Sequence, residues 1–121
     1  MRSFAPAELD YLKGERRLAR LATADQSGLP HVTPVGMWHY NPELGTIDVT
    51  GHDFGATRKY RNVKANPQAA LVVDDLASID PWRARAVLVQ GPAEAIEDAE
   101  QGALIRIRPD RIISWGLGEA G

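Results

Sequence analysis

Four basic side chains lie within seven residues of a chain that is slightly acidic overall. They are Arg58, Lys59, Arg61 and Lys64, and they directly follow Thr57. The N-terminus of a helix offers free backbone N–H groups and a partial positive charge to an anion, and arginine and lysine add full charges and hydrogen-bond donors. A helix starting here can therefore hold a phosphate group. The alternative is an ordinary solvated helix face, which composition alone favours.

The remaining polar residues form no self-sufficient catalytic set. His31, His39 and His52 lack helical i, i+4 spacing, and the chain contains no cysteine, so surface or strand-edge positions are expected rather than a metal site. Asp74 and Asp75 follow a strand-like run, where a turn or capping role is expected. The sequence contains neither a G-x-S-x-G motif nor a P-loop. If the protein is an enzyme, we expect its chemistry to belong to a bound cofactor.

Length and composition indicate one globular domain over residues 1–121. The chain carries 14 basic and 16 acidic side chains, for a net charge of −2, whereas nucleic-acid-binding domains are usually basic. The N-terminus lacks the apolar core of a signal peptide, and no apolar run approaches membrane-spanning length. We therefore expect a cytoplasmic protein without a nucleic-acid or membrane partner. Dimerisation would supplement the small core of a domain of this size.

Two helices are expected. The first opens the chain with Pro6 at its first position and ends at Gly14. The second extends from Thr57 to Asn66 and is ended by the following proline. Spacing of i, i+3 should turn Tyr60 and Val63 of this second helix toward the core.

The rest of the chain is typical of short β-strands separated by turns. Strands are expected over residues 17–25, 31–40, 46–51, 68–75 and 84–97, with one bent or two short strands over 103–118. Pro34 indicates an edge strand or a bulge, and Gly91 a bulge or bend. The resulting six or seven mostly antiparallel strands and two short helices predict a mainly β fold, a closed antiparallel barrel.

The order of four segments is distinctive. RLARLATADQSGLPHVTPVGMWHY is followed by TIDVTG, TRKYRNVKANPQAALVVDD and PWRARAVLVQGPAEAIE. This order resembles the pyridoxamine 5′-phosphate oxidase-like superfamily of FMN-binding split β-barrels, and more narrowly its branch that uses the deazaflavin coenzyme F420. The resemblance covers the chain from about Phe4 to Leu117, and its most specific part is the string KYRNVKANP.

The resemblance implies a cofactor site with two parts. In the family, the helix after the third strand holds the cofactor phosphate, which here implies Thr57, Arg58, Lys59 and Arg61. The tricyclic ring lies along the second and third strands, which here implies Thr33, Pro34, Val35, Gly36, Met37, Val49, Thr50 and Gly51. Family sites lie at a dimer interface, so Trp82 or Arg83 from the second subunit of a homodimer is expected to complete the pocket.

The function implied by the resemblance is hydride transfer between reduced F420 and a small organic acceptor. FMN shares the ribityl-phosphate end of F420, so an FMN enzyme of the same fold is an alternative, and a non-catalytic F420- or flavin-binding protein is another. The anionic polyglutamate tail of F420 could meet Arg58, Arg61 and Lys64, which favours F420. The C-terminal substrate-binding segment of the pyridoxamine phosphate oxidases is missing from the sequence, so vitamin B6 oxidation is not expected. A barrel whose site has decayed would bind neither cofactor.

Overall fold

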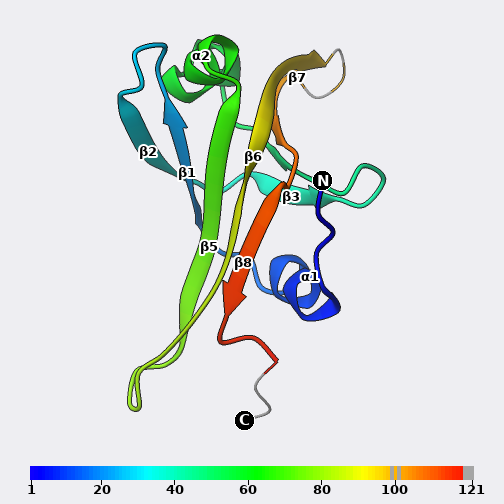
Figure 1. The fold of residues 1–121 in the computed structure, drawn as a ribbon, viewed down its shortest axis with the longest axis vertical. Helices are drawn as coiled ribbons and strands as arrows, with labels where there is room; N and C mark the ends of the chain where they lie inside the picture. The colour runs from blue at the N-terminus through cyan, green and yellow to red at the C-terminus, as the bar shows by residue number, and fades with distance from the viewer. Residues whose placement is uncertain (99, 101, 119–121) are drawn as a thin grey trace.

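The computed structural model describes residues 1–98, 100 and 102–118. Over these residues the chain forms a mainly β fold (Figure 1). Its strands are β1 (Ala19–Ala24), β2 (Pro30–Val35), β3 (Trp38–Asn41), β4 (Thr46–Val49), β5 (Gln68–Ser78), β6 (Arg83–Asp98), β7 (Gly102–Ile107) and β8 (Arg111–Trp115). Its helices are α1 (Pro6–Lys13), the 3-10 turn η1 (Phe54–Ala56) and α2 (Arg58–Ala65).

The strands pair antiparallel in the order β2-β1-β5-β6-β7-β4-β3, and β8 pairs with β6 outside this path. The long strand β6 joins the two halves of the fold, since its first part pairs with β8 and its last part with β7. Along its other edge β6 pairs with β5. This arrangement confirms the prediction of a mainly β, antiparallel split barrel with two helices.

The strand predicted over residues 31–40 is in fact two strands, which raises the number of described strands to eight. Only Gly36 and Met37 separate β2 from β3, yet these strands are the two ends of the ladder. A link this short spans on the order of 10 Å, so the ends of the ladder must lie close together. The Arg16 guanidinium stabilises the bend by donating to the carbonyl oxygens of Gly36 and Trp38.

Proline and glycine take the positions that their backbones require. Pro34 lies on β2, an edge strand, as predicted. Gly91 makes no bulge, because its register with Ala69 on β5 is regular. Instead it lies where β6 changes partner from β8 to β7, and a Cβ atom at this position would come 1.9 Å from the backbone oxygen of Arg108. Only glycine permits so close an approach.

The apolar core fills the space enclosed by the strands, and both helices pack onto it. Tyr11 and Leu12 of α1 are buried in the core. Tyr60 and Val63 of α2 are 2% and 1% exposed, which confirms the predicted inner face of this helix. Figure 1 shows α2 near one end of β5 and β6, whereas α1 lies beside β8. Among the described helices, none has the length and apolar character needed to cross a membrane.

Candidate functional site

The first turn of α2 is held by Thr57. The Thr57 hydroxyl donates to the carbonyl oxygen of Phe54 at 2.6 Å and accepts from the amide of Tyr60 at 3.3 Å. The backbone N–H groups of Arg58 and Lys59 have no hydrogen-bond partner within the described part of the chain. Thr57 therefore shapes the turn, while two amide donors remain available to an anion.

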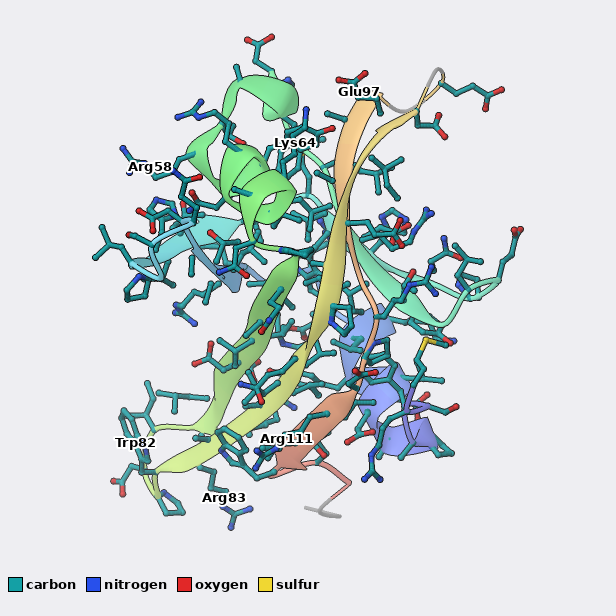
Figure 2. The ribbon with its side chains drawn as sticks, turned by 45° about the horizontal axis from the view of Figure 1, so that its top comes forward. Arg58, Lys64, Trp82, Arg83, Glu97 and Arg111 are labelled. Carbon is teal, nitrogen blue, oxygen red and sulfur yellow. The ribbon has the colours of Figure 1, made fainter. Side chains whose placement is uncertain are left out.

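The basic side chains around this turn are not neutralised. None of Arg58, Lys59, Arg61 and Lys64 forms an ion pair with a carboxylate of the described residues. Arg61 donates to the carbonyl oxygen of Ala56 at 2.7 Å. Lys59 Nζ lies 5.5 Å from the centre of the Phe54 ring. The Arg58 side chain is exposed. Figure 2 shows Arg58 and Lys64 on different sides of α2, with Lys64 on the side nearer Glu97.

A histidine that sequence reasoning did not select lies beside α2. His31 is opposite Thr23 in the β1–β2 ladder, and the Thr23 hydroxyl accepts from Asn62 of α2 at 3.1 Å. The Nδ1 atom of His31 is buried and has no hydrogen-bond partner in the described structure. Buried polar atoms are normally paired, so this nitrogen is an exception. Because the atom is buried, a ligand can pair with it only after the surrounding side chains move. The sequence did contain a pattern that could have identified His31 as an inward-facing residue. His31, Thr33 and Val35 alternate along β2 and therefore lie on the same face of this strand as the buried Val35.

The residues proposed to lie along the cofactor ring fall into two groups. Val35 and Val49 are core residues, 5% and 0% exposed, so only their backbones can face a ligand. Pro34 is exposed and Thr33 is half-buried.

The link between β2 and β3 meets the end of β4. The Thr50 amide donates to the carbonyl oxygen of Met37 at 2.8 Å, and Met37 is 47% exposed. A Cβ atom on Gly51 would lie 3.0 Å from the ring of Phe54 in η1, directly before α2. The structure therefore brings Met37, Thr50 and Gly51 together and connects them to the start of α2 through Phe54.

Trp82 lies far from this group of residues within one chain. It sits on the β5–β6 hairpin and is 70% exposed. Figure 2 shows Trp82 and Arg83 at the opposite end of the molecule from Arg58. A single chain therefore does not bring Trp82 to α2.

Asp74 and Asp75 lie within β5, so the predicted turn or capping role is wrong. Strand β5 extends beyond them to Ser78, and both carboxylates pair with arginines, Asp74 with Arg20 on β1. Hydrogen bonds from Arg85, Arg17 and Tyr11 outweigh burial and hold the pKa of Asp75 well below its usual range.

Strand order, the change of partner along β6 and a basic helix following β4 define the class of this protein, a split β-barrel with an unneutralised helix terminus. A sequence-family model described as pyridoxamine 5′-phosphate oxidase matches residues 5–119. The chain belongs to the pyridoxamine 5′-phosphate oxidase family.

Known proteins agree with this assignment. The chain is 40% identical over 121 residues to the 5a,11a-dehydrotetracycline/5a,11a-dehydrooxytetracycline reductase of Streptomyces rimosus, covering 94% of this chain and 84% of the reductase. A conserved hypothetical protein from Mycobacterium tuberculosis has a similar structure, with a TM-score of 0.73, 19% identity, and coverage of 96% of this chain and 90% of that one. An F420 reductase gives a TM-score of 0.66 with 23% identity, covering 86% and 94% of the two chains. These two structures share the fold.

Proposed function

We propose that this protein is an F420-dependent oxidoreductase that transfers a hydride between reduced F420 and a small organic acceptor. The observation that carries the proposal is the start of α2, where, among the described residues, two amides have no partner and four basic side chains form no ion pair. The buried Nδ1 of His31 lies on β2, opposite the Thr23 that Asn62 of α2 contacts. This donor set suits a phosphate ester next to a polar ring. The relative with 40% identity is a reductase, which supports the class of reaction. The F420 reductase of similar fold supports the choice of cofactor.

The residues around α2 would hold the cofactor in two places. The amides of Arg58 and Lys59 and the side chains of Arg58, Lys59 and Arg61 would bind the phosphate, while Thr57 fixes the turn. The ring would lie along Thr33, Pro34, Val35, Gly36, Met37, Val49, Thr50 and Gly51. Bound F420 supplies the hydride chemistry, and the chain orients the ring, binds the acceptor and excludes water.

The functional unit would be a homodimer. Trp82 stands 70% exposed at the opposite end of the chain from Arg58, so it can approach a cofactor on α2 only from another molecule (Figure 2). We therefore assign the completion of each cofactor pocket to Trp82 of the partner subunit. The acceptor would be a small molecule, and the surrounding compartment would be the cytoplasm.

Titration of the cofactor-free protein with F420, and separately with FMN, tests the proposal through quenching of cofactor fluorescence. Saturable binding of F420 with weaker binding of FMN is the expected result. Preference for FMN would replace the proposal with an FMN enzyme of the same fold. Binding of neither would mean that the basic segment is only a solvated helix face. Binding of F420 without turnover of any acceptor would indicate a carrier rather than an enzyme.

A further inference from the structure

A second site lies at the end of the molecule away from α2. A cavity of about 690 Å³, open to solvent on one side, lies there between α1, the β5–β6 hairpin and the segment that ends β8. This volume is within the range of small-molecule sites. The cavity has an aromatic and basic lining that includes Tyr11, Arg17, Trp82, Arg83, Arg85 and Trp115. The lining includes neither residues of α2 nor the residues expected along the cofactor ring. It includes Trp82 and Arg83, the two residues considered for completing the cofactor pocket from the second subunit.

The cavity wall is cationic. Three arginines, Arg17, Arg83 and Arg85, line it against one acidic side chain, Asp10. Asp75 does pair with two of these arginines, but it does not itself line the cavity. Asp10 and Asp75 together balance two of the three guanidinium charges, which leaves one positive charge in excess among these groups.

The two inner arginines are held rigidly but keep free donors. Arg85 donates to both oxygens of Asp75 at 2.8 and 2.7 Å, and Arg17 Nε donates to the same carboxylate at 2.9 Å. In the described structure, Nη2 of Arg17 and Nη1 of Arg85 have no hydrogen-bond partner. Positioned donors of this kind bind an anion without a large loss of side-chain entropy.

Tyr11 lines the cavity with a neutral hydroxyl group whose proton is already donated within the protein. Its hydroxyl donates to Asp75 at 2.9 Å, and burial together with this bond raises the pKa of Tyr11 well above its usual value. The phenol therefore stays protonated at neutral pH and adds no negative charge to the wall.

Two exposed indoles give the cavity flat apolar surfaces. Trp82 and Trp115 line it while remaining 70% and 50% exposed. Large exposed aromatic rings next to arginines are suited to stacking with a conjugated ring that carries negative charge.

We infer that this cavity binds a planar, conjugated organic anion, such as a polycyclic carboxylate or enolate, and that this molecule is the acceptor. The acceptor role rests on the proposed function, whereas the binding site rests on the cavity alone. The reaction would need a carbon–carbon double bond of the acceptor conjugated to a carbonyl group that is separate from the anionic group. The far carbon of that double bond would gain a hydride, with reduced F420 as the donor and oxidised F420 as the second product. The electron pair of the double bond would move to the carbonyl oxygen, the guanidinium groups would stabilise the charge, and water would supply the proton.

The site would be shared between two chains. The cavity and α2 lie at opposite ends of one molecule (Figure 2). The acceptor role therefore requires a homodimer in which the hairpin end of one subunit meets α2 of the other.

The test uses the full chain without cofactor and the fluorescent probe 9-anthracenecarboxylate. We expect saturable binding of one probe per chain, and weaker binding of 9-anthracenemethanol, which has the same rings without the charge. Arg83→Gln and Trp115→Ala change exposed side chains of the cavity and should each weaken probe binding about tenfold, the effect of one lost charged or stacking contact. Arg111→Ala is the matched control, because Arg111 is exposed on β8 outside this cavity, and it should leave probe binding unchanged.

Absence of probe binding, equal affinity for the neutral analogue, or equal effects of all three variants would overturn the inference. F420 titration of the same samples separates this inference from the proposed function. F420 binding without probe binding contradicts the acceptor cavity alone. Probe binding without F420 binding supports the anion site and overturns its role as acceptor site together with the proposed function.

Discussion

Arg85 and Asp75 face each other directly across the β5–β6 ladder, and the Arg85 guanidinium grips both oxygens of the Asp75 carboxylate at 2.8 and 2.7 Å. Arg17 reaches the same carboxylate from the segment between α1 and β1. One acidic side chain therefore fixes two arginines from separate parts of the chain and ties the helix end to the hairpin strands.

Replacing Asp75 with asparagine should destabilise the fold. The change leaves two partly buried guanidinium groups without their counter-charge, which we expect to lower the free energy of unfolding by about 1–3 kcal/mol. Urea unfolding measures the change. Asp74→Asn is the matched control, because the Asp74–Arg20 pair is exposed and its loss should cost less than about 1 kcal/mol. Equal losses in the two variants would contradict the prediction.

Stability should fall in acid. Hydrogen bonds from Arg85, Arg17 and Tyr11 lower the pKa of Asp75. Burial alone would raise the pKa of Asp48, but bonds from Arg106, Asn41 and Thr46 lower it overall.

A carboxyl group whose pKa is lower in the folded state stabilises the fold above its unfolded-state pKa, and this stabilisation is lost as the pH falls through the folded-state value. We therefore expect the free energy of unfolding to decrease below about pH 4. Asp75→Asn should show a shallower decrease between pH 4 and lower values than the wild type. Parallel curves for the two proteins would exclude Asp75 as a cause.

Removing charge at the start of α2 should weaken cofactor binding. Lys59→Ala or Arg58→Ala should each cost about 1–3 kcal/mol of F420 binding free energy if the side chain makes a charge-assisted bond to the phosphate. Fluorescence titration measures the affinity. Lys13→Ala, at the end of α1, is the control and should bind F420 like the wild type. Unchanged affinity in both α2 variants would refute the phosphate site.

His31 should act on stability and binding in opposite directions. His31→Leu removes the buried Nδ1 that has no partner among the described residues, so the cofactor-free protein should be as stable as the wild type or about 1 kcal/mol more stable. If this nitrogen pairs with the cofactor, the same variant should bind F420 more weakly by about 1 kcal/mol. Thermal unfolding and F420 titration give the two values. A loss of stability with unchanged affinity would identify His31 as a purely structural residue.

Two glycines should respond differently to a methyl group. Gly91→Ala places a Cβ atom 1.9 Å from a backbone oxygen, so we expect a loss of more than about 3 kcal/mol or failure to fold. Gly36→Ala meets only the tip of Leu18 at 3.7 Å, so stability should change little. Circular dichroism and urea unfolding compare the variants. Gly36→Ala should weaken F420 binding if the ring approaches that backbone. Similar stability of both variants would contradict the close approach of the Gly91 and Arg108 backbones.

Local features of the fold could be predicted because their causes are local. Pro34 cannot donate a hydrogen bond and so indicated an edge strand, and the spacing of Tyr60 and Val63 indicated the buried face of α2. The split at Gly36 could not be predicted, because hydrophobic alternation does not tell which strand pairs with which.

The electrostatic features depended on distant residues. Asp75 meets Arg17, 58 positions away in the sequence, so no local pattern could distinguish this pair from a turn. Likewise, the unpaired Nδ1 of His31 can be recognised only once the strand pairing and the packing of α2 onto β1 are known. Sequence reasoning selected the basic segment at Arg58 and, through the family resemblance, Trp82 and Arg83. It did not predict the cavity that these two residues line, because the wall of this cavity comes from four separate segments.

The two-residue link at Gly36 and Met37 also bears on aggregation. Both ends of the main ladder belong to the single stretch of residues 30–41, and among the described strands β8, which pairs only with β6, leaves one further open edge. On β2, Pro30 and Pro34 each lack an N–H group, which interrupts the row of donors that a fibril-forming strand would need. The two prolines therefore protect the edge of β2 against edge-to-edge polymerisation, and exchanging them for β-branched residues would weaken that protection.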